Sequence, residues 1–184
     1  STPIKSSAAS DVYKRQALGE DLSPIEVHIK QFYGIEINDF AVTVARTALW
    51  IAESQMMKET EDIVGQDLDF LPLKSSAHIH EANALRIDWN EVVPASKLSF
   101  ILGNPPFYGA RLMTKSQKED VSIVFGKDWK NAGNLDYVSC WFKKSADFMQ
   151  GTTISAALVA TNSIIQGDSV AALWKNLLLS LIHI

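Results

Sequence analysis

The chain has 184 residues, about the length of one domain, and 47% of them are hydrophobic against 21% charged, which excludes a disordered chain. Its single cysteine, Cys140, excludes an intramolecular disulfide framework, and its formal net charge of −4 argues against a compact nucleic-acid clamp. Because no apolar run reaches the roughly 20 residues that cross a bilayer, we expect a cytoplasmic protein with no membrane partner.

The two ends of the chain differ from its middle. Residues 1–16 have neither helical nor strand periodicity, and residues 180–184 end without a cap or a polar tail. We interpret 1–16 as a non-native or disordered end and 180–184 as a truncated end, and we leave both out of the search for a site. Residues 17–179 then form one domain.

Strands and helices are expected to alternate from Gln31 onward. Strands are expected at 31–38, within 79–87, at 97–103 and at 154–160, and helices at about 39–58, at 136–149 and from Asp168 onward. Residues 67–73 resemble a loop, and the polar residues 114–130 favour no regular element. This alternation predicts an α/β fold with a mostly parallel sheet, in which ligands gather beyond the carboxyl ends of the strands.

The tetrapeptide Asn104-Pro105-Pro106-Phe107 directly follows the apolar strand expected at 97–103. A proline disfavours the helical conformation of the residue before it, so the backbone at Asn104 and Pro105 is expected to be extended. The result is a stiff loop that offers the Asn104 side-chain oxygen and the Pro105 carbonyl as fixed acceptors beside an aromatic ring. An ordinary proline-rich strand exit is the alternative interpretation of the tripeptide by itself.

Such a loop suits the methylation of an amino group that is conjugated to an aromatic ring. The lone pair of that nitrogen is delocalised, and two acceptors that take its hydrogens favour a pyramidal nitrogen with the lone pair directed outward. A sulfonium methyl donor requires no strong base, so catalysis would come from positioning and from preorganised dipoles. The Phe107 ring would stack on the flat face of the substrate.

Three blocks of the sequence resemble the adenine-N6 DNA methyltransferases, and in particular the MmeI-like branch of type II restriction-modification enzymes. The tetrapeptide at 104–107 resembles the catalytic motif, Phe-Tyr-Gly-Ile-Glu-Ile at 32–37 resembles the second strand, and Ala-Asn-Ala-Leu-Arg-Ile-Asp-Trp at 82–89 resembles the segment before the catalytic strand. The resemblance implies a Rossmann-like class I methyltransferase fold. It also implies methyl transfer from S-adenosylmethionine to adenine in double-stranded DNA.

The resemblance further implies which residues bind the cofactor. Glu36 would accept hydrogen bonds from both ribose hydroxyls of S-adenosylmethionine, and Ile37 would pack on the cofactor adenine. Asn83 and Ala84 fall where the family contacts the amino group of that adenine, although family members often carry Asp in place of Asn83.

The catalytic tetrapeptide would act on a base that has left the duplex, because the N6 amino group is otherwise paired. Asn104 and Pro105 would hold that amino group, and Pro106 completes the rigid motif. Phe107 would stack on the extruded base, and Tyr108 is a second candidate for stacking.

Basic residues are concentrated in the middle of the chain. Residues 1–96 carry eight Lys and Arg against fifteen Asp and Glu, whereas residues 97–150 carry eight against five. A DNA backbone would therefore be met by this middle segment, and Arg111, Lys115 and Lys118 are the candidates for phosphate contacts. A solvated polar loop is the alternative interpretation of these three residues.

A glycine-rich motif is expected upstream of Phe32 in this family, where it surrounds the methionine end of the cofactor, yet the sequence contains no Gly-x-Gly. We therefore expect a methyltransferase domain that is incomplete at its N-terminus, binds the cofactor weakly alone, and is separated from the target-recognition and nuclease domains of its parent polypeptide. One alternative is an Asn-Pro-Pro methyltransferase that acts on protein glutamine or on RNA. Another is a non-catalytic fragment that binds DNA or a partner protein.

Other residues with chemical potential are interpreted as structural. His78 and His80 form a His-x-His pair, but no ligand set at zinc spacing accompanies them, so no metal site is expected. Cys140 lies on an apolar helix face and is expected in the core. Trp89 is a candidate to line the cofactor pocket, whereas packing is expected of the tryptophans within the predicted helices, Trp50, Trp141 and Trp174.

Overall fold

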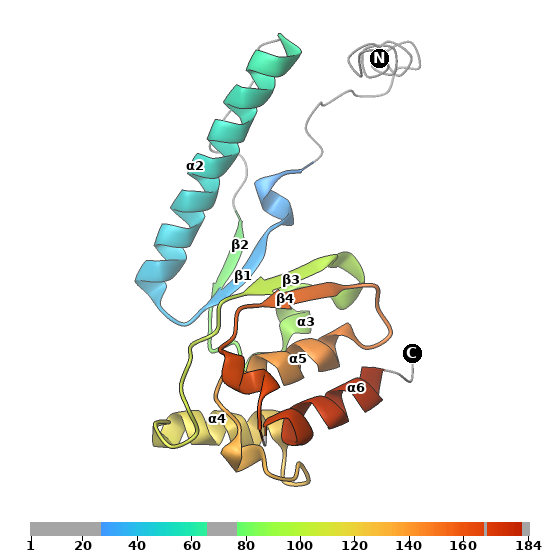
Figure 1. The fold of residues 1–184 in the computed structure, drawn as a ribbon. Helices are drawn as coiled ribbons and strands as arrows, with labels where there is room; N and C mark the ends of the chain where they lie inside the picture. Colours follow the sequence, from blue (N-terminus) through green and yellow to red (C-terminus); the bar gives the residue numbers. More distant parts are fainter. Residues whose placement is uncertain (1–26, 66–76, 168, 182–184) are drawn as a thin grey trace. The chain divides into compact units, whose positions relative to one another are not determined.

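The computed structural model describes residues 27–65, 77–167 and 169–181 (Figure 1). The chain divides into two compact units, of which the first comprises residues 1–32 and 43–78 and the second comprises residues 33–42 and 79–184. No helix within the described ranges combines the length and the apolar character needed to cross a membrane.

The first unit contains the short 3-10 turn η1 (Ile29–Gln31) and most of the long helix α2 (Asp39–Val64). Asn38 caps α2, because its side-chain oxygen accepts the N–H of Ala41 at 3.1 Å. The helix continues beyond the predicted end at 58, since no helix-breaking residue precedes Gly65, which has a φ of 71°. Val42 is the one buried residue of α2.

Four strands form two separate pairs in the described part of the chain, β1 (Tyr33–Glu36) with β2 (His78–Glu81), and β3 (Phe100–Gly103) with β4 (Ser155–Leu158). The register of the second pair runs from Phe100 opposite Ser155 to Gly103 opposite Leu158, so β3 and β4 are parallel. Each strand is shorter than the segment in which it was predicted.

The first pair is also parallel. The N–H of His78 donates to the carbonyl of Phe32, and four residues further along both strands the N–H of Ala82 donates to the carbonyl of Glu36, each at 2.9 Å. Both strand pairs therefore agree with the predicted parallel arrangement.

The remaining helices belong to the second unit: α3 (Trp89–Val92), η2 (Ala95–Lys97), α4 (Lys115–Phe125), η3 (Ala132–Asn134), α5 (Ser139–Met149), η4 (Asn162–Ile165), η5 (Val170–Trp174) and α6 (Lys175–Leu181). Figure 1 shows α4, α5 and α6 grouped below β3 and β4. Their core includes Leu85, Leu135, Val138 and Leu173, each 2% exposed or less. Cys140 is fully buried in the same core, which confirms the interpretation of this residue.

No element was assigned to the polar and mixed residues 114–130, but α4 occupies 115–125. Thr114 and Gln117 form a reciprocal cap in which each side chain accepts the backbone N–H of the other residue, at 3.3 and 2.8 Å. The helix ends at Gly126, whose φ of 69° suits a residue without a Cβ atom. The spacing of Thr114 and Gln117 could have predicted the start of this helix, but the polar composition of the segment drew attention away from it.

The last predicted helix is divided into two forms. Asp168, its expected cap, lies outside the described residues. Residues Val170–Trp174 are π-helical, and α6 follows directly. The indole N–H of Trp129 donates to the carbonyl of Ala172 at 2.8 Å, and a side-chain donor inserted into a helix in this way disturbs its regular hydrogen bonding.

Candidate active site

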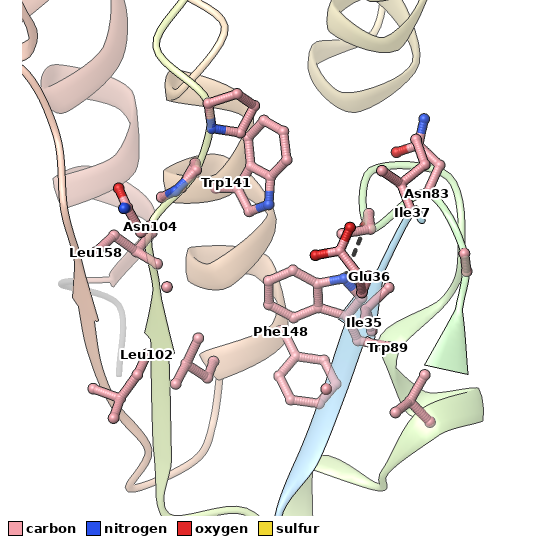
Figure 2. A pocket seen from close by; sticks show the side chains of 18 of the residues that line it. Ile35, Glu36, Ile37, Asn83, Trp89, Leu102, Asn104, Trp141, Phe148 and Leu158 are labelled. Carbon is pink, nitrogen blue, oxygen red and sulfur yellow. Dashed lines mark hydrogen bonds between the residues drawn. The ribbon is translucent and has the colours of Figure 1, made fainter. Parts of the chain in front are cut away.

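A cavity of about 750 Å³ lies in the second unit between β1 and β3, and residues along the whole of both strands line it. Figure 2 shows Asn104 and Leu158 on its β3–β4 side, with Glu36, Ile37 and Asn83 on its β1–β2 side. The structure thus brings together most residues expected from the sequence to bind the cofactor or act in catalysis. These are Glu36, Ile37, Asn83, Ala84, Asn104, Pro105 and Pro106.

Two hydrogen bonds, one to the backbone carbonyl of Glu36 and one to its carboxylate, fix this residue at the end of β1. Its carbonyl accepts the N–H of Ala82, and its carboxylate accepts the N–H of Asn38 at 3.1 Å. The carboxylate group is partly buried and faces the cavity, so it can accept further hydrogen bonds from a polar ligand. Ile37, the next residue, lines the same cavity although it is 69% exposed.

The loop that follows β2 is fixed by three hydrogen bonds. The side chain of Asn83 accepts the N–H of Leu85 at 2.9 Å and donates to Asp120 at 3.3 Å. The carbonyl of Ala84 accepts the indole N–H of Trp89 at 2.8 Å. Asn83 and Ala84 therefore line the cavity from a loop whose conformation is stabilised by hydrogen bonds.

Trp89 lines the cavity, in agreement with the sequence interpretation. Its ring meets Phe148 edge to face with centroids 5.6 Å apart, and the ammonium group of Lys144 lies 5.8 Å from the ring centroid. Lys144 also donates to the carbonyl of Ile87. Burial lowers the pKa of Lys144, and the nearby charge of Asp88 opposes that shift.

The tetrapeptide after β3 contributes its first three residues to the cavity. Pro105 is buried, whereas Asn104 and Pro106 are exposed at the mouth. In the described part of the chain no hydrogen bond engages the Asn104 side chain or the Pro105 carbonyl. Both oxygens are therefore available to accept N–H groups of a ligand.

Phe107 and Tyr108 stand outside the cavity lining, with 46% and 44% of their surface exposed. The carbonyl of Tyr108 accepts the N–H of Tyr137 at 2.8 Å, and the two rings meet edge to face with centroids 6.4 Å apart. These contacts fix the backbone just after the tetrapeptide while both rings keep an open face.

The three basic candidates are all exposed. Arg111 lies within a turn in which the N–H of Leu112 donates to the carbonyl of Gly109. Lys115 and Lys118 lie in the first turns of α4, so the segment that carries them is an exposed helix and not a loop.

A buried carboxylate that the sequence did not indicate lies at the edge of the cavity. Asp120 of α4 is 2% exposed and accepts hydrogen bonds from Tyr137 at 2.6 Å, from Arg86 at 2.5 Å and from Asn83. Burial alone would raise the pKa of Asp120, but these hydrogen bonds outweigh burial and lower it. Burial and the bond to Asp120 raise the pKa of Tyr137, so its phenol remains a donor.

Cys140 and the histidine pair offer no reactive or metal centre of their own. Burial raises the pKa of the Cys140 thiol to about 12. His78 and His80 are exposed on β2, and no group of three potential metal ligands occurs among the residues described.

Known proteins resemble the chain in both sequence and structure. A family model described as the DNA-methyltransferase domain of MmeI matches residues 6–184. The chain belongs to this MmeI methyltransferase-domain family. The resemblance noted in three blocks of its sequence is thereby confirmed for nearly the whole chain.

The known MmeI-family relatives are much longer. DNA methyltransferase A of Bacillus subtilis (strain 168) is 43% identical over 166 residues, which cover 89% of this chain and 19% of that protein. The structure is similar to that of the type IIL restriction-modification enzyme MmeI, solved in complex with DNA, with a TM-score of 0.80 and 46% identity. That match covers 85% of this chain and 21% of the MmeI chain. The chain therefore spans about a fifth of the length of these relatives.

Sequence reasoning about this MmeI-family chain missed Asp120, Tyr137 and the position of Trp141. Trp141 was expected to serve packing only, but it also lines the cavity, with its ring 5.2 Å from that of Tyr137. Asp120 shares a helical face with Gln117 and Val124, because residues three and four apart are neighbours on a helix. That spacing shows which face Asp120 occupies but does not indicate that the face is buried.

Proposed function

We propose that this site transfers a methyl group from S-adenosylmethionine to the N6 amino group of adenine in double-stranded DNA, as the modification activity of a restriction-modification system. The observation that carries the proposal is that Glu36, Asn104 and Pro105 line one cavity. Membership of the MmeI family supports it. Catalysis requires a donor site and an acceptor site within reach of each other.

The cavity suits the nucleoside half of the cofactor. A carboxylate at Glu36 can accept two hydroxyl donors, and the apolar groups of Ile37 and Trp89 offer surfaces for a flat base. Its volume of about 750 Å³ is in the range of sites for small molecules. S-adenosylmethionine supplies an electrophilic methyl group when it is bound.

The tetrapeptide would orient the acceptor nitrogen. The Asn104 side-chain oxygen and the Pro105 carbonyl would each accept one N–H of the target amino group, which directs the nitrogen lone pair toward the methyl donor. No charged base lies in the tetrapeptide. The target nitrogen would form its bond to the methyl carbon as the bond from that carbon to sulfur breaks, and the proton would then pass from the cationic nitrogen to water. Preorganised dipoles of this kind lower the barrier because they need no reorientation during the reaction.

The rim of the cavity would meet the nucleic acid. Phe107 and Tyr108 expose aromatic rings beside the tetrapeptide, where an extruded base would stack. Arg111, Lys115 and Lys118 would contact backbone phosphates, which position a duplex without reading its sequence. The related MmeI structure is itself a complex with DNA, which supports this assignment.

We also propose that the second unit is part of a Rossmann-like class I methyltransferase domain whose glycine-rich loop lies upstream. The separation of the described strands into two parallel pairs supports this, because a complete domain of this class has a continuous sheet. The target-recognition and nuclease functions would belong to other parts of the parent polypeptide, of which the relatives' greater length is an indication.

The test uses the full-length parent protein and S-adenosylmethionine with a labelled methyl group. Duplex DNA, RNA and protein are offered separately, and the labelled DNA is digested to nucleosides and analysed by mass spectrometry. We expect label in N6-methyladenine. Label in protein glutamine, in RNA or in a cytosine would contradict the proposal, as would DNA binding without any methylation.

Two substitutions separate the roles within the site. Asn104→Ala should lower methyl transfer about 100-fold or more while the affinity for the cofactor is retained, because it removes one fixed acceptor. Glu36→Ala should weaken cofactor binding itself. Asn176→Ala on the exposed face of α6 is the matched control and should leave both properties unchanged.

A further inference from the structure

Asp120 connects three segments of the second unit that are distant in the sequence. Its carboxylate accepts the side-chain N–H of Asn83, the Nε–H of Arg86 and the phenol of Tyr137, while only 2% of the residue is exposed. The guanidinium of Arg86 also reaches Ser116 at 3.3 Å and Glu119 at 3.9 Å. One buried group thus joins the loop after β2, helix α4 and the start of α5.

Two of these donors, Asn83 and Tyr137, belong to or contact the loops on the two sides of the cavity. Asn83 belongs to the loop proposed to hold the cofactor adenine. Tyr137 holds the backbone of Tyr108 through its N–H, and Tyr108 follows the catalytic tetrapeptide. The phenol of Tyr137 is itself fixed by the 2.6 Å bond to Asp120.

We propose that Asp120 is a positioning residue that sets the cofactor loop through Asn83 and the catalytic loop through Tyr137. This inference rests on the proposed function, since it assigns a role within that same site. Asp120 touches neither reacting atom in this scheme. It acts by keeping the two loops at the separation that methyl transfer requires.

A purely structural role explains the cluster less well. Replacing a buried, charge-paired cluster with well-packed apolar residues is often neutral or stabilising, so the fold alone gains little from this arrangement. Asn83, Asp120 and Tyr137 of the cluster are also among the residues that line the cavity. Residues that support a functional loop through hydrogen bonds are expected at this location.

The two branches of the cluster predict different kinetic effects. Asp120→Asn removes the charge and cannot satisfy all three donors, so the affinity for S-adenosylmethionine and kcat should each fall about 10- to 100-fold. Tyr137→Phe keeps the ring and leaves the bonds from Arg86 and Asn83 in place. It should lower kcat about tenfold while the cofactor Kd changes less than about threefold.

The experiment measures the cofactor Kd by calorimetry, kcat with duplex DNA, and the midpoint of thermal unfolding, all on the full-length protein. Asp128→Asn, an exposed position in the loop after α4, is the matched control for loss of a carboxylate. Variants that lower only the unfolding midpoint, with Kd and kcat equal to wild type, would overturn the positioning role. If Asp120→Asn yields no folded protein, the kcat and Kd of Tyr137→Phe decide the question.

Failure of the proposed function gives a different result. In that case the wild-type protein itself would neither bind S-adenosylmethionine nor methylate DNA. A wild type that does both, together with an unchanged kcat in Tyr137→Phe and unchanged values in Asp120→Asn, would refute the role of Asp120 alone.

Discussion

The indole N–H of Trp89 donates a 2.8 Å hydrogen bond to the carbonyl of Ala84, which ties an aromatic wall of the cavity to the loop after β2. The ring is in turn held by its edge-to-face contact with Phe148. A single side chain therefore both shapes the cavity and fixes the backbone that faces it.

Trp89→Phe should weaken cofactor binding by about three- to tenfold, because the aromatic surface is kept and one neutral hydrogen bond is lost. Calorimetry with S-adenosylmethionine on the full-length protein measures this effect. Trp174→Phe is the matched control, since the Trp174 indole also donates to a carbonyl, that of Ile164 at 2.7 Å, but does not line the cavity. Equal losses of affinity in both variants would contradict the assignment.

Gly34 of β1 lies where a larger residue cannot fit without movement. A Cβ atom added there would lie 2.7 Å from Cδ1 of Ile79, which is buried on β2. We expect Gly34→Ala to lower the free energy of unfolding by about 1–3 kcal/mol. Chemical denaturation of the chain, followed by tryptophan fluorescence, gives this value.

Ile79→Val removes the clashing Cδ1 atom and costs about 0.5–1.5 kcal/mol by itself. The double variant Gly34→Ala, Ile79→Val should therefore be more stable than the sum of the two single losses predicts. Gly133→Ala, where a Cβ would meet nothing within 4 Å, is the control for the effect of alanine alone. Strict additivity would show that the Ile79 contact is not the cause.

The residues that line the cavity at the ends of β1, β2 and β3 could be found from the sequence, because short motifs mark those positions. The strand ends near Glu36 and Asn104 were recognisable from apolar runs followed by polar or proline residues. Helix α4 was missed because its first two turns consist of Lys, Ser, Gln, Glu and Asp, which on composition alone describe a solvated segment. Burial there is determined by partners distant in the sequence.

The burial of Asp120 could not be predicted from the sequence either. A carboxylate in a polar helix is usually exposed, and its partners Arg86 and Tyr137 are 34 and 17 residues away. Only the tertiary arrangement brings three donors to one carboxylate. A pattern within one helix shows which face a residue occupies and does not show what that face meets.

The Cys140 thiol should resist alkylation in the folded chain. The side chain is fully buried, and its pKa is raised to about 12, so almost no thiolate exists at pH 8. Mass spectrometry after iodoacetamide treatment should show no labelling of the native chain and full labelling in denaturant. Ser122→Cys at an exposed position of α4 provides the positive control, and rapid labelling of Cys140 in the native chain would contradict the expectation.

The free energy of unfolding should fall at alkaline pH, because burial raises the pKa of Cys140 and of Tyr137. Burial raises the pKa of Cys140 from 9.0 to about 12 and raises the pKa of Tyr137 above its ordinary value of 10.0. Above those ordinary values the unfolded chain loses protons that the folded chain keeps, so the stabilisation present below pH 9 is lost as the pH rises.

Each group contributes up to about 1.4 kcal/mol per pH unit to this loss. Denaturation midpoints measured from pH 8 to pH 11 should therefore decrease, and the slope should be smaller in Cys140→Ala and in Tyr137→Phe. An alkaline slope that is the same in both variants and in the wild type would show that other groups cause the decrease.

Strand β3 carries large exposed apolar side chains, since Phe100 is 67% exposed and Leu102 78% exposed, and both also line the cavity. Its partner on one side is β4, and no other described strand pairs with its second edge. The unpaired backbone groups of such an open apolar edge can form hydrogen bonds with strands of other molecules. The chain in isolation should therefore aggregate as its concentration rises, which static light scattering would detect, whereas the longer parent protein should remain monodisperse over the same range.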